Sequence, residues 1–346
     1  MNVFWDTLDW RILDDLRRRF LERAPVGAAA SGGSSGYWRS EAELDNYDFT
    51  YAQRIGWKWD AVLRELSLRQ WQPPAGPLLD WGCGSGIAGR SVVSHYGAAR
   101  FGTLYVHDRS PLAMRFALDA AGRVPGVEAR PWSGGADEAA ETAAVSIGTL
   151  VVSHVVNELD AAGRAELGGL LARAAAVLWV EPGTYADSRA LIAFREEWLG
   201  EFDVVAPCTH AARCGMLNAH NDRHWCHHFA APPAGILANA QWVRFAQRAG
   251  IDLRSLPYSF LALEQRPARA AAPGTPDDAW ARVIGAPRLY KGFAKVLACS
   301  REDVRETEMQ ARDNPEILRA YKKDAGPILL RGHADAKERL VAEESL

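Results

Sequence analysis

Runs of apolar residues alternate with amphipathic stretches through the middle of the chain, and this alternation predicts an α/β fold. Apolar runs typical of buried strands lie at residues 78–81, 104–108, 149–159 and 177–183, with a weaker one at 127–130. Amphipathic stretches at 87–96 and 111–121 predict helices between them. Continuous apolar strands that alternate with helices are typical of a parallel sheet covered on both faces. We therefore expect such a sheet at the centre of the protein.

The outer parts of the chain have different patterns. Residues 1–24 have the spacing of an amphipathic helix, residues 25–36 have a linker composition, and residues 37–71 combine helical spacing with many aromatic side chains. We predict three regions: an N-terminal helical region at 1–72, a main domain at 73–300 with an insertion at 201–257, and a C-terminal tail at 301–346. Strands at 258–263 and 292–299 would close the sheet, and the mixed charges of the tail predict a solvated helix.

The strand at 78–81 runs into a glycine-rich turn, Asp80-Trp81-Gly82-Cys83-Gly84-Ser85-Gly86. Such a turn lets a nucleotide approach the backbone closely. The spacing Gly82-x-Gly84-x-Gly86 after an acid suits S-adenosylmethionine (SAM), whereas Gly84-x-Gly86-x-x-Gly89 satisfies a dinucleotide fingerprint. The Asp80 carboxylate would attract the α-ammonium group of SAM and repel a pyrophosphate. The turn therefore favours SAM over a nicotinamide cofactor.

Further polar residues follow the other predicted strands, where ligands of such sheets bind. Asp108 ends the second strand, 22 residues beyond Gly86, at the place of a carboxylate that accepts ribose hydroxyls. The fourth strand runs into Ser153-His154-Val155-Val156-Asn157-Glu158. The predicted SAM-binding residues are Asp80, Gly82, Gly84, Gly86, Asp108 and Ser153. The candidates for orienting a methyl acceptor or taking its proton are His154, Asn157 and Glu158.

Cysteines form a second group of chemically active residues. The chain has five, and Cys208, Cys214 and Cys226 lie within nineteen residues, with Cys299 farther along. Four thiolates suit either a cubane iron–sulfur cluster or a structural zinc site. The absence of a Cys-x-x-Cys pair favours iron–sulfur, while nearby histidines keep zinc as the alternative, and buried thiols without metal remain the third. Those histidines are His210, His220, His224, His227 and His228.

Composition and charge restrict the partners and the compartment. The net charge of −3 gives no overall attraction to nucleic acid, so an RNA partner would have to bind local patches of Arg and Lys. No apolar run reaches the length of a membrane span, and the first residues lack an export signal. We therefore expect a cytoplasmic protein without a membrane partner.

Several phrases of the sequence together resemble a known family. They are Tyr51-Ala52-Gln53-Arg54-Ile55-Gly56-Trp57-Lys58-Trp59, the glycine turn, Ser153-His154-Val155-Val156-Asn157-Glu158-Leu159, Glu181-Pro182-Gly183-Thr184, Ala206-Pro207-Cys208-Thr209-His210 and Trp225-Cys226-His227-His228-Phe229. The chain looks like a bacterial member of the Rsm22 family, whose mitochondrial relatives associate with the ribosomal small subunit. The resemblance covers most of residues 37–300. It implies a class I SAM-dependent methyltransferase (Rossmann-like) sheet, a role on or with the small subunit and its rRNA, and a [4Fe–4S] cluster on Cys208, Cys214, Cys226 and Cys299.

Methyl transfer itself is a separate question. The Asn/Asp-Pro-Pro-aromatic loop that orients a base amine is absent after the fourth strand, where Ser153-His154 begins instead. The leading hypothesis is a methyltransferase-like protein that acts in ribosome assembly or rRNA methylation. The alternatives are a catalytically silent RNA- or ribosome-binding module stabilised by SAM and metal, and an NAD-dependent oxidoreductase.

Overall fold

The computed structural model describes residues 5–21, 38–132, 146–266 and 280–346, and the predicted linker at 25–36 lies outside them. The chain divides into two compact units. Unit 1 comprises Met1–Ser67, Gln72–Val180 and Ala230–Leu256, and unit 2 comprises Leu68–Trp71, Glu181–Phe229 and Pro257–Leu346. The boundaries that we predict at residues 72 and 300 stay predictions. None of the described helices is both long and apolar enough to cross a membrane.

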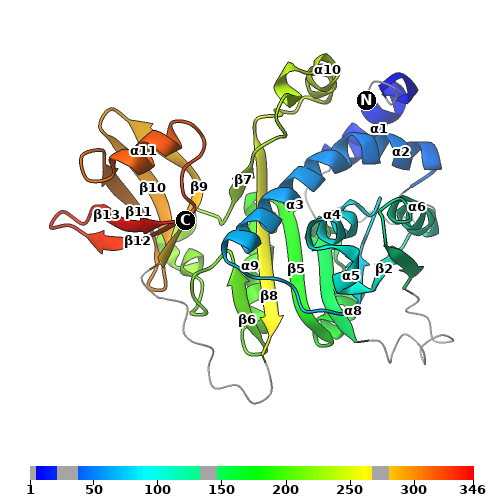
Figure 1. The fold of residues 1–346 in the computed structure, drawn as a ribbon, viewed down its shortest axis with the longest axis horizontal. Helices are drawn as coiled ribbons and strands as arrows, with labels where there is room; N and C mark the ends of the chain where they lie inside the picture. Colours follow the sequence, from blue (N-terminus) through cyan, green and yellow to red (C-terminus); the bar gives the residue numbers. More distant parts are fainter. Residues whose placement is uncertain (1–4, 22–37, 133–145, 267–279) are drawn as a thin grey trace. The chain divides into compact units, whose positions relative to one another are not determined.

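Unit 1 contains the predicted parallel sheet, whose strands lie side by side in Figure 1. The strands are β1 (Leu78–Trp81), β2 (Thr103–His107), β3 (Glu128–Pro131), β4 (Ile147–Ser153) and β5 (Ala174–Pro182). Their order is β3-β2-β1-β4-β5, and every neighbouring pair is parallel. Successive strands extend from β1 toward β3 on one side and from β4 toward β5 on the other, so the strand order reverses between β1 and β4. Open α/β sheets bind ligands at this position. The predicted fold class is confirmed as α/β with a parallel central sheet.

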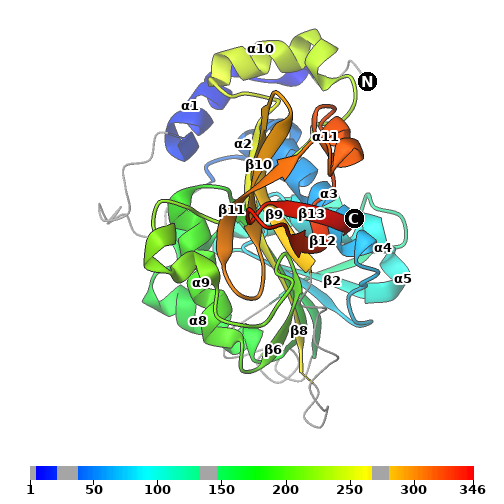
Figure 2. The same cartoon turned by 90° about the vertical axis from the view of Figure 1, so that its left-hand side faces the viewer.

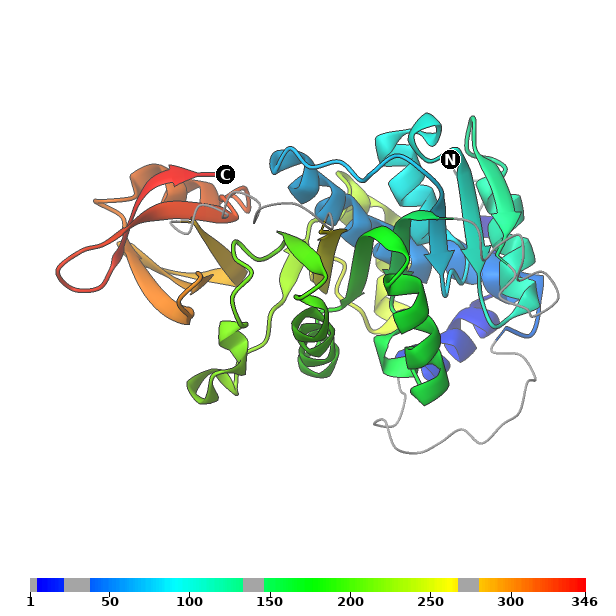
Figure 3. The same cartoon turned by 90° about the horizontal axis from the view of Figure 1, so that it is seen from below.

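Helices cover both faces of this sheet. The helices that follow the strands are α4 (Ile87–Tyr96), α5 (Ala98–Phe101), α6 (Pro111–Ala121) and α8 (Ala161–Leu171). In Figure 3, α4 and α8 lie on opposite faces of the strands. The Ser110 hydroxyl caps α6 by accepting the Ala113 N–H, and Pro111 occupies the first turn, where its missing N–H costs nothing. Capping thus begins this helix where the sequence predicts it.

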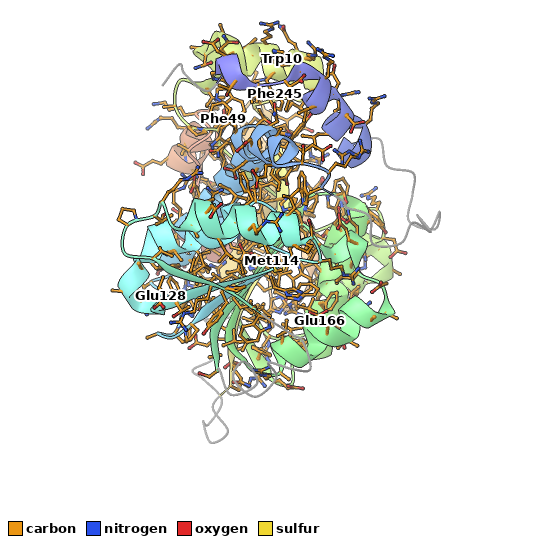
Figure 4. All side chains as sticks on the ribbon, turned by 90° about the vertical axis from the view of Figure 1, so that its right-hand side faces the viewer. Trp10, Phe49, Met114, Glu128, Glu166 and Phe245 are labelled. Atoms are coloured by element: carbon orange, nitrogen blue, oxygen red, sulfur yellow. The ribbon has the colours of Figure 1, made fainter. Side chains whose placement is uncertain are left out.

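Aromatic side chains join the remaining helices of unit 1. These helices are α1 (Trp10–Leu21), α2 (Glu41–Phe49), α3 (Tyr51–Leu68) and α10 (Ala240–Ala249). The Trp242 ring packs edge-on against Trp5 at 5.3 Å and lies 4.9 Å from Trp57, measured between ring centroids. Trp10, Phe49 and Phe245 lie at this same end of the unit in Figure 4. The aromatic helical pattern therefore builds a core.

Unit 2 begins with α9 (Tyr185–Trp198) and β6 (Phe202–Ala206). A loop with short 3-10 turns at Gly215–Leu217 and Ala219–Asn221 then leads to β7 (His228–Ala230). Strand β8 (Leu256–Gln265) pairs with β6 in the antiparallel direction. The Arg69 guanidinium donates to the carbonyl oxygens of Val205, Pro207 and Cys208, and so fixes the loop that follows β6.

The last part of unit 2 is a small curved β-sheet, drawn in orange and red in Figure 2. Its elements are β9 (Trp280–Tyr290), β10 (Phe293–Cys299), β11 (Val304–Gln310), α11 (Pro315–Tyr321), β12 (Leu329–Ala334) and β13 (Leu340–Ser345). The strand order is β11-β10-β9-β12-β13, and β11 also packs beside β13. Five antiparallel strands that curl back on themselves in this way resemble an OB-type barrel.

This barrel corrects two expectations. The strand predicted at 292–299 is present as β10, but it belongs to the barrel and does not close the parallel sheet. The tail after residue 300 forms strands instead of a solvated helix. Met309 faces the barrel core while its neighbour Glu308 pairs across to Lys295, so the charges alternate with core positions. Because the tail carries many charges of both signs, the two-residue alternation of apolar and polar positions that indicates a strand is hard to see in the sequence.

Candidate functional site

The glycine turn connects β1 to α4 with three glycines in left-handed backbone conformations. The φ angles of Gly82, Gly84 and Gly86 are 70°, 53° and 78°. The Gly82 and Cys83 N–H groups both donate to the His107 carbonyl oxygen, at 2.8 and 2.9 Å, and so join the end of β1 to the end of β2. A Cβ atom on Gly82 would lie 2.7 Å from Val155 Cγ1, whereas one on Gly84 would meet nothing within 4 Å. The turn is therefore closed beneath Gly82 and open above Gly84.

Asp80 lies beneath this turn and is fully buried. Its Oδ2 atom accepts the Gly89 N–H at 2.9 Å, in the first turns of α4. A Cβ atom on Gly89 would approach the same oxygen to 2.8 Å, so only glycine permits this contact. Burial raises the pKa of the Asp80 carboxyl to about 7. Asp80 does not line the cavity described below, and this geometry gives it a role in holding α4. Its contact with the ammonium group of SAM stays a prediction.

Asp108 stands at the carboxyl end of β2, where the sequence predicts a ribose ligand. Its Oδ2 atom accepts the Gly84 N–H at 2.9 Å, and its Oδ1 atom accepts the Ser110 N–H at 2.8 Å. Burial raises the pKa of this carboxyl, and the two hydrogen bonds oppose that effect. Each carboxylate oxygen can accept more than one hydrogen bond, so Asp108 retains acceptor capacity toward the cavity.

A cavity of about 690 Å³ opens above the turn, within the range of small-molecule sites. Several apolar side chains line it, among them Trp38, Tyr47, Ile55, Trp81 and Leu112. Of the residues predicted from the sequence, the cavity brings together Gly82, Gly84, Asp108, Ser153, His154 and Glu158. Asp80, Gly86 and Asn157 do not line it, and Asn157 is exposed.

A hydrogen-bonded chain of side chains borders one side of the cavity. Lys58 Nζ lies 3.2 Å from His154 Nε2, and His154 Nδ1 lies 3.2 Å from Ser153 Oγ, which also accepts the Trp59 indole N–H at 3.0 Å. An ammonium group can only donate, so Nε2 is the acceptor and the ring proton is on Nδ1. Ser153 then accepts twice, and its own O–H is the remaining donor at the cavity wall.

This arrangement bears on the chemistry of His154. Burial lowers the pKa of its imidazole well below the usual range, and the charges of Lys58 and Arg54 add to the effect. Both ring nitrogens are engaged, so the imidazole is neutral and offers no nitrogen to an incoming proton. The sequence analysis misses Lys58 and Trp59 as site residues, because their position on an aromatic helix resembles that of core residues.

Unit 2 contains a second cavity, about 30 Å³ in volume, lined by all four cysteines outside the glycine turn. Burial raises the pKa of the Cys299 thiol well above its usual range, and the charges of Cys208, Cys226 and Cys214 raise it further. Burial and the neighbouring Cys208 raise the pKa of Cys214 to about 11. The four thiols are therefore close enough to influence one another electrostatically.

Two histidine rings and one arginine lie close to these thiols. His210 Nε2 lies 3.7 Å from Cys299 Sγ, and His228 Nε2 lies 3.8 Å from Cys226 Sγ. Arg195, only 2% exposed, lines the same cavity, and its Nη2 donates to the carbonyl oxygens of His210 and Ala212.

The other histidines considered as zinc ligands bind elsewhere. His220 Nε2 pairs with Asp303 at 2.9 Å, His224 accepts from Arg223, and His227 stacks on Trp225. Within the described ranges, no group of three or more His, Cys, Asp or Glu side chains has an arrangement that could hold a metal ion. The predicted metal-binding character of the insertion is therefore not shown.

The buried Asp80 carboxyl gives a prediction about pH and stability. Its pKa of about 7 in the folded state lies above the value near 3.9 of an unfolded aspartate. Between these values the folded state retains a proton that the unfolded state has lost, so stability falls as pH rises through this window. Asp80→Asn removes the titration and keeps an acceptor for the Gly89 N–H. We expect the variant to gain stability relative to the parent between pH 4 and pH 8, by up to about 4 kcal/mol.

Thermal unfolding of both proteins across this pH range, without added ligand, measures the difference. Asp119→Asn provides the matched control, because Asp119 is exposed on α6. A loss of stability in Asp80→Asn that is the same at pH 4 and pH 8 would contradict the assignment of a costly buried charge.

Comparisons with known proteins place the chain in a family. No curated protein sequence matches it significantly. Two similar solved structures are the N-methyltransferase NodS from Bradyrhizobium japonicum in complex with S-adenosyl-L-homocysteine and magnesium protoporphyrin IX methyltransferase from Synechocystis with bound SAM. NodS is 12% identical, with a TM-score of 0.37, over 64% of this chain and 91% of that one. The Synechocystis enzyme is 12% identical, with a TM-score of 0.35, over 73% of this chain and 91% of that one.

The family model described as "Mitochondrial small ribosomal subunit Rsm22" matches residues 51–325, which is most of the chain. The protein therefore belongs to the Rsm22 family.

Proposed function

We propose that this protein is a SAM-binding, methyltransferase-like factor that acts with the small ribosomal subunit and its rRNA. The family supports the ribosomal partner, and the geometry of the glycine turn supports the cofactor. We further propose that it works in the bacterial cytoplasm, without a membrane partner.

The hydrogen bonds within the glycine turn favour SAM over a dinucleotide. The glycines of the alternative dinucleotide fingerprint are Gly84, Gly86 and Gly89, and a pyrophosphate would need N–H groups of this turn. All three N–H groups are already used: Gly84 donates to Asp108, Gly86 to the Cys83 carbonyl oxygen, and Gly89 to Asp80. SAM carries no pyrophosphate and so needs none of these three N–H groups, while the Asp108 carboxylate and an apolar cavity are both present for its adenosine part.

The residues present fit SAM in three respects. Asp108 can accept ribose hydroxyls, the open side of Gly84 admits a ligand next to the backbone, and the Ser153 hydroxyl offers a donor at the cavity wall. When bound, SAM would supply an electrophilic methyl group. His154 would position Ser153 and would not take a proton, and Glu158 is the cavity-lining carboxylate that could do so.

We also propose that Cys208, Cys214, Cys226 and Cys299 hold a [4Fe–4S] cluster. The donor set supports this proposal, because all four thiols line one cavity. Arg195 places a positive charge beside Cys208 and Cys214, where bound thiolates would be negative. Among the described residues its Nε has no partner. Zinc on the same four thiolates is the alternative outcome of the metal analysis below.

SAM affinity should depend on Asp108. Asp108→Asn keeps the side-chain size but removes the negative charge and one acceptor, so we expect SAM to bind about ten-fold or more weakly. Isothermal titration calorimetry with SAM, and with NAD for comparison, measures this effect. Asp119→Asn, outside the cavity on α6, should bind SAM like the parent protein. Tight binding of NAD by the parent would reject the proposal.

Catalysis is tested separately. The engaged ring of His154 favours a silent module that binds SAM without transferring its methyl group. With tritiated SAM and immature small subunits, we expect binding with little label on the rRNA. Label that depends on Glu158, lost in Glu158→Gln, would instead establish methyl transfer and contradict the silent module.

The metal site gives a prediction about purified protein. Anaerobically isolated protein should be brown and contain about four iron and four sulfide per chain. Cys208→Ser should lose most of this iron, because one of the four ligands is missing. Cys83→Ser is the matched control, since this buried cysteine lies in the glycine turn of unit 1 and should leave the iron content unchanged. Colourless protein with one zinc per chain would reject the cluster.

A further inference from the structure

The segment from Trp225 to Phe229 has two chemically different faces. Cys226 lines the thiol cavity, and His228 lies on the same side of the segment, with its Nε2 atom 3.8 Å from Cys226 Sγ. Trp225, His227 and Phe229 alternate with them on the other face, as expected of an extended chain. The hydroxyl groups of Ser188 and Ser259 both donate to the Cys226 carbonyl oxygen, at 2.7 and 2.6 Å. The cysteine side of the segment is therefore firmly held, and the aromatic side is presented outward.

Four rings form a continuous row on this outward face, which we name the aromatic row: Tyr185, Trp225, His227 and Phe229. Neighbouring ring centroids lie 6.2 Å apart for Tyr185 and Trp225, 4.6 Å for Trp225 and His227, and 5.4 Å for His227 and Phe229. The two ends of the row are open to solvent, since Tyr185 is 46% and Phe229 43% exposed.

Hydrogen bonds fix the aromatic row in place. The Trp225 indole N–H donates to the Gly183 carbonyl oxygen at 2.9 Å, and the Tyr185 hydroxyl donates to the Asp222 carbonyl oxygen at 2.8 Å. The Gly285 N–H donates to the His227 carbonyl oxygen at 2.8 Å, which joins the row to β9. A preformed row loses little conformational entropy when a ligand stacks on it.

Positive charge gathers beside the row. The Arg223 side chain donates from Nε to the Nε2 atom of His224, next to Trp225, at 3.2 Å. Arg189 also lies over the Tyr185 ring, 5.2 Å from its centroid. Glu306 pairs with both Arg288 and Lys295, so these three side chains retain one net positive charge.

The sequence around the row adds little negative charge. Asp222 is the single acidic residue between Ala219 and Phe229. The surroundings of the row therefore suit a ligand that combines flat rings with negative charge.

We propose that the aromatic row is a binding site for unpaired RNA, in which exposed bases stack on the rings and Arg223 and Arg288 contact phosphates. Stacking on aromatic side chains combined with basic residues is the general way in which proteins hold single strands, and it is tolerant of sequence. In duplex RNA the bases are stacked on one another, so their faces are not available to stack on the aromatic row. The proposal names the surface for the RNA partner and in that respect rests on the proposed function.

Fluorescence anisotropy with a labelled twelve-nucleotide oligouridine, and with a duplex of equal length, tests the site in the full-length, anaerobically purified protein. We expect the single strand to bind more tightly than the duplex, and Phe229→Ala to weaken it about five-fold or more. Arg223→Glu should weaken binding and reduce its dependence on salt. Ultraviolet crosslinking should place the RNA on the peptide that contains residues 225–229.

Two controls separate this site from a general effect. Tyr290→Ala removes a ring that is 44% exposed and stacked on Phe293 elsewhere in unit 2, and Arg254→Glu makes the charge change of Arg223→Glu in unit 1. Both should bind within two-fold of the parent. Iron content and melting temperature of each variant establish that the fold is intact.

Equal losses in Phe229→Ala and Tyr290→Ala, a preference for duplex, or binding only to small-subunit proteins would overturn the proposal. SAM titration of the same samples keeps the two proposals apart. A protein that fails to bind SAM but loses RNA through Phe229→Ala would contradict the proposed cofactor and support the RNA site. A protein that binds SAM but keeps its RNA affinity in Phe229→Ala would support the proposed cofactor and contradict the RNA site.

Discussion

The hydrogen bond from the Gly89 N–H to the buried Asp80 carboxylate is the contact on which the cofactor site depends. It brings the first turns of α4 directly onto β1, which only a glycine at position 89 allows. The turn between them has three glycines in left-handed conformations. Its N–H groups donate to the carbonyl oxygens of His107 and Cys83 and to the Asp108 carboxylate. What remains open to a ligand is the space above Gly84 and the outer side of Asp108. A buried carboxylate, costly by itself, thus holds the start of α4 against β1 beneath the turn.

Two proposed sites of unit 2 share one short segment. Alternate residues of the stretch 225–229 face the thiol cavity and the aromatic row, so the two proposed sites share a backbone. Any change in the position of Cys226 would move Trp225 and His227 with it. If both proposals hold, a ligand on the cysteines would affect the position of the aromatic row.

The sequence predicts the parallel sheet well, because its central strands are continuous apolar runs and helices such as α6 have a clear cap, as at Ser110. It also places Asp108 at the carboxyl end of the second strand, where the structure has this residue lining the cavity. Its role as a ribose ligand stays a prediction. The sequence misses the contact of the Asp80 carboxyl with the Gly89 N–H, because spacing carries no information about that close approach. The contact of Asp80 with the SAM ammonium group stays a prediction. The sequence also fails in the barrel, where charged residues such as Glu308 alternate with core residues such as Met309. The partnership of Lys58 with His154 joins residues 96 positions apart and has no local signal.

The central claim is that the cavity above the glycine turn binds SAM. The most direct measurement is to denature protein purified without added cofactor and identify the released small molecules by mass spectrometry. The account predicts SAM or S-adenosylhomocysteine in the parent protein. Release of NAD or NADP in stoichiometric amount would contradict it.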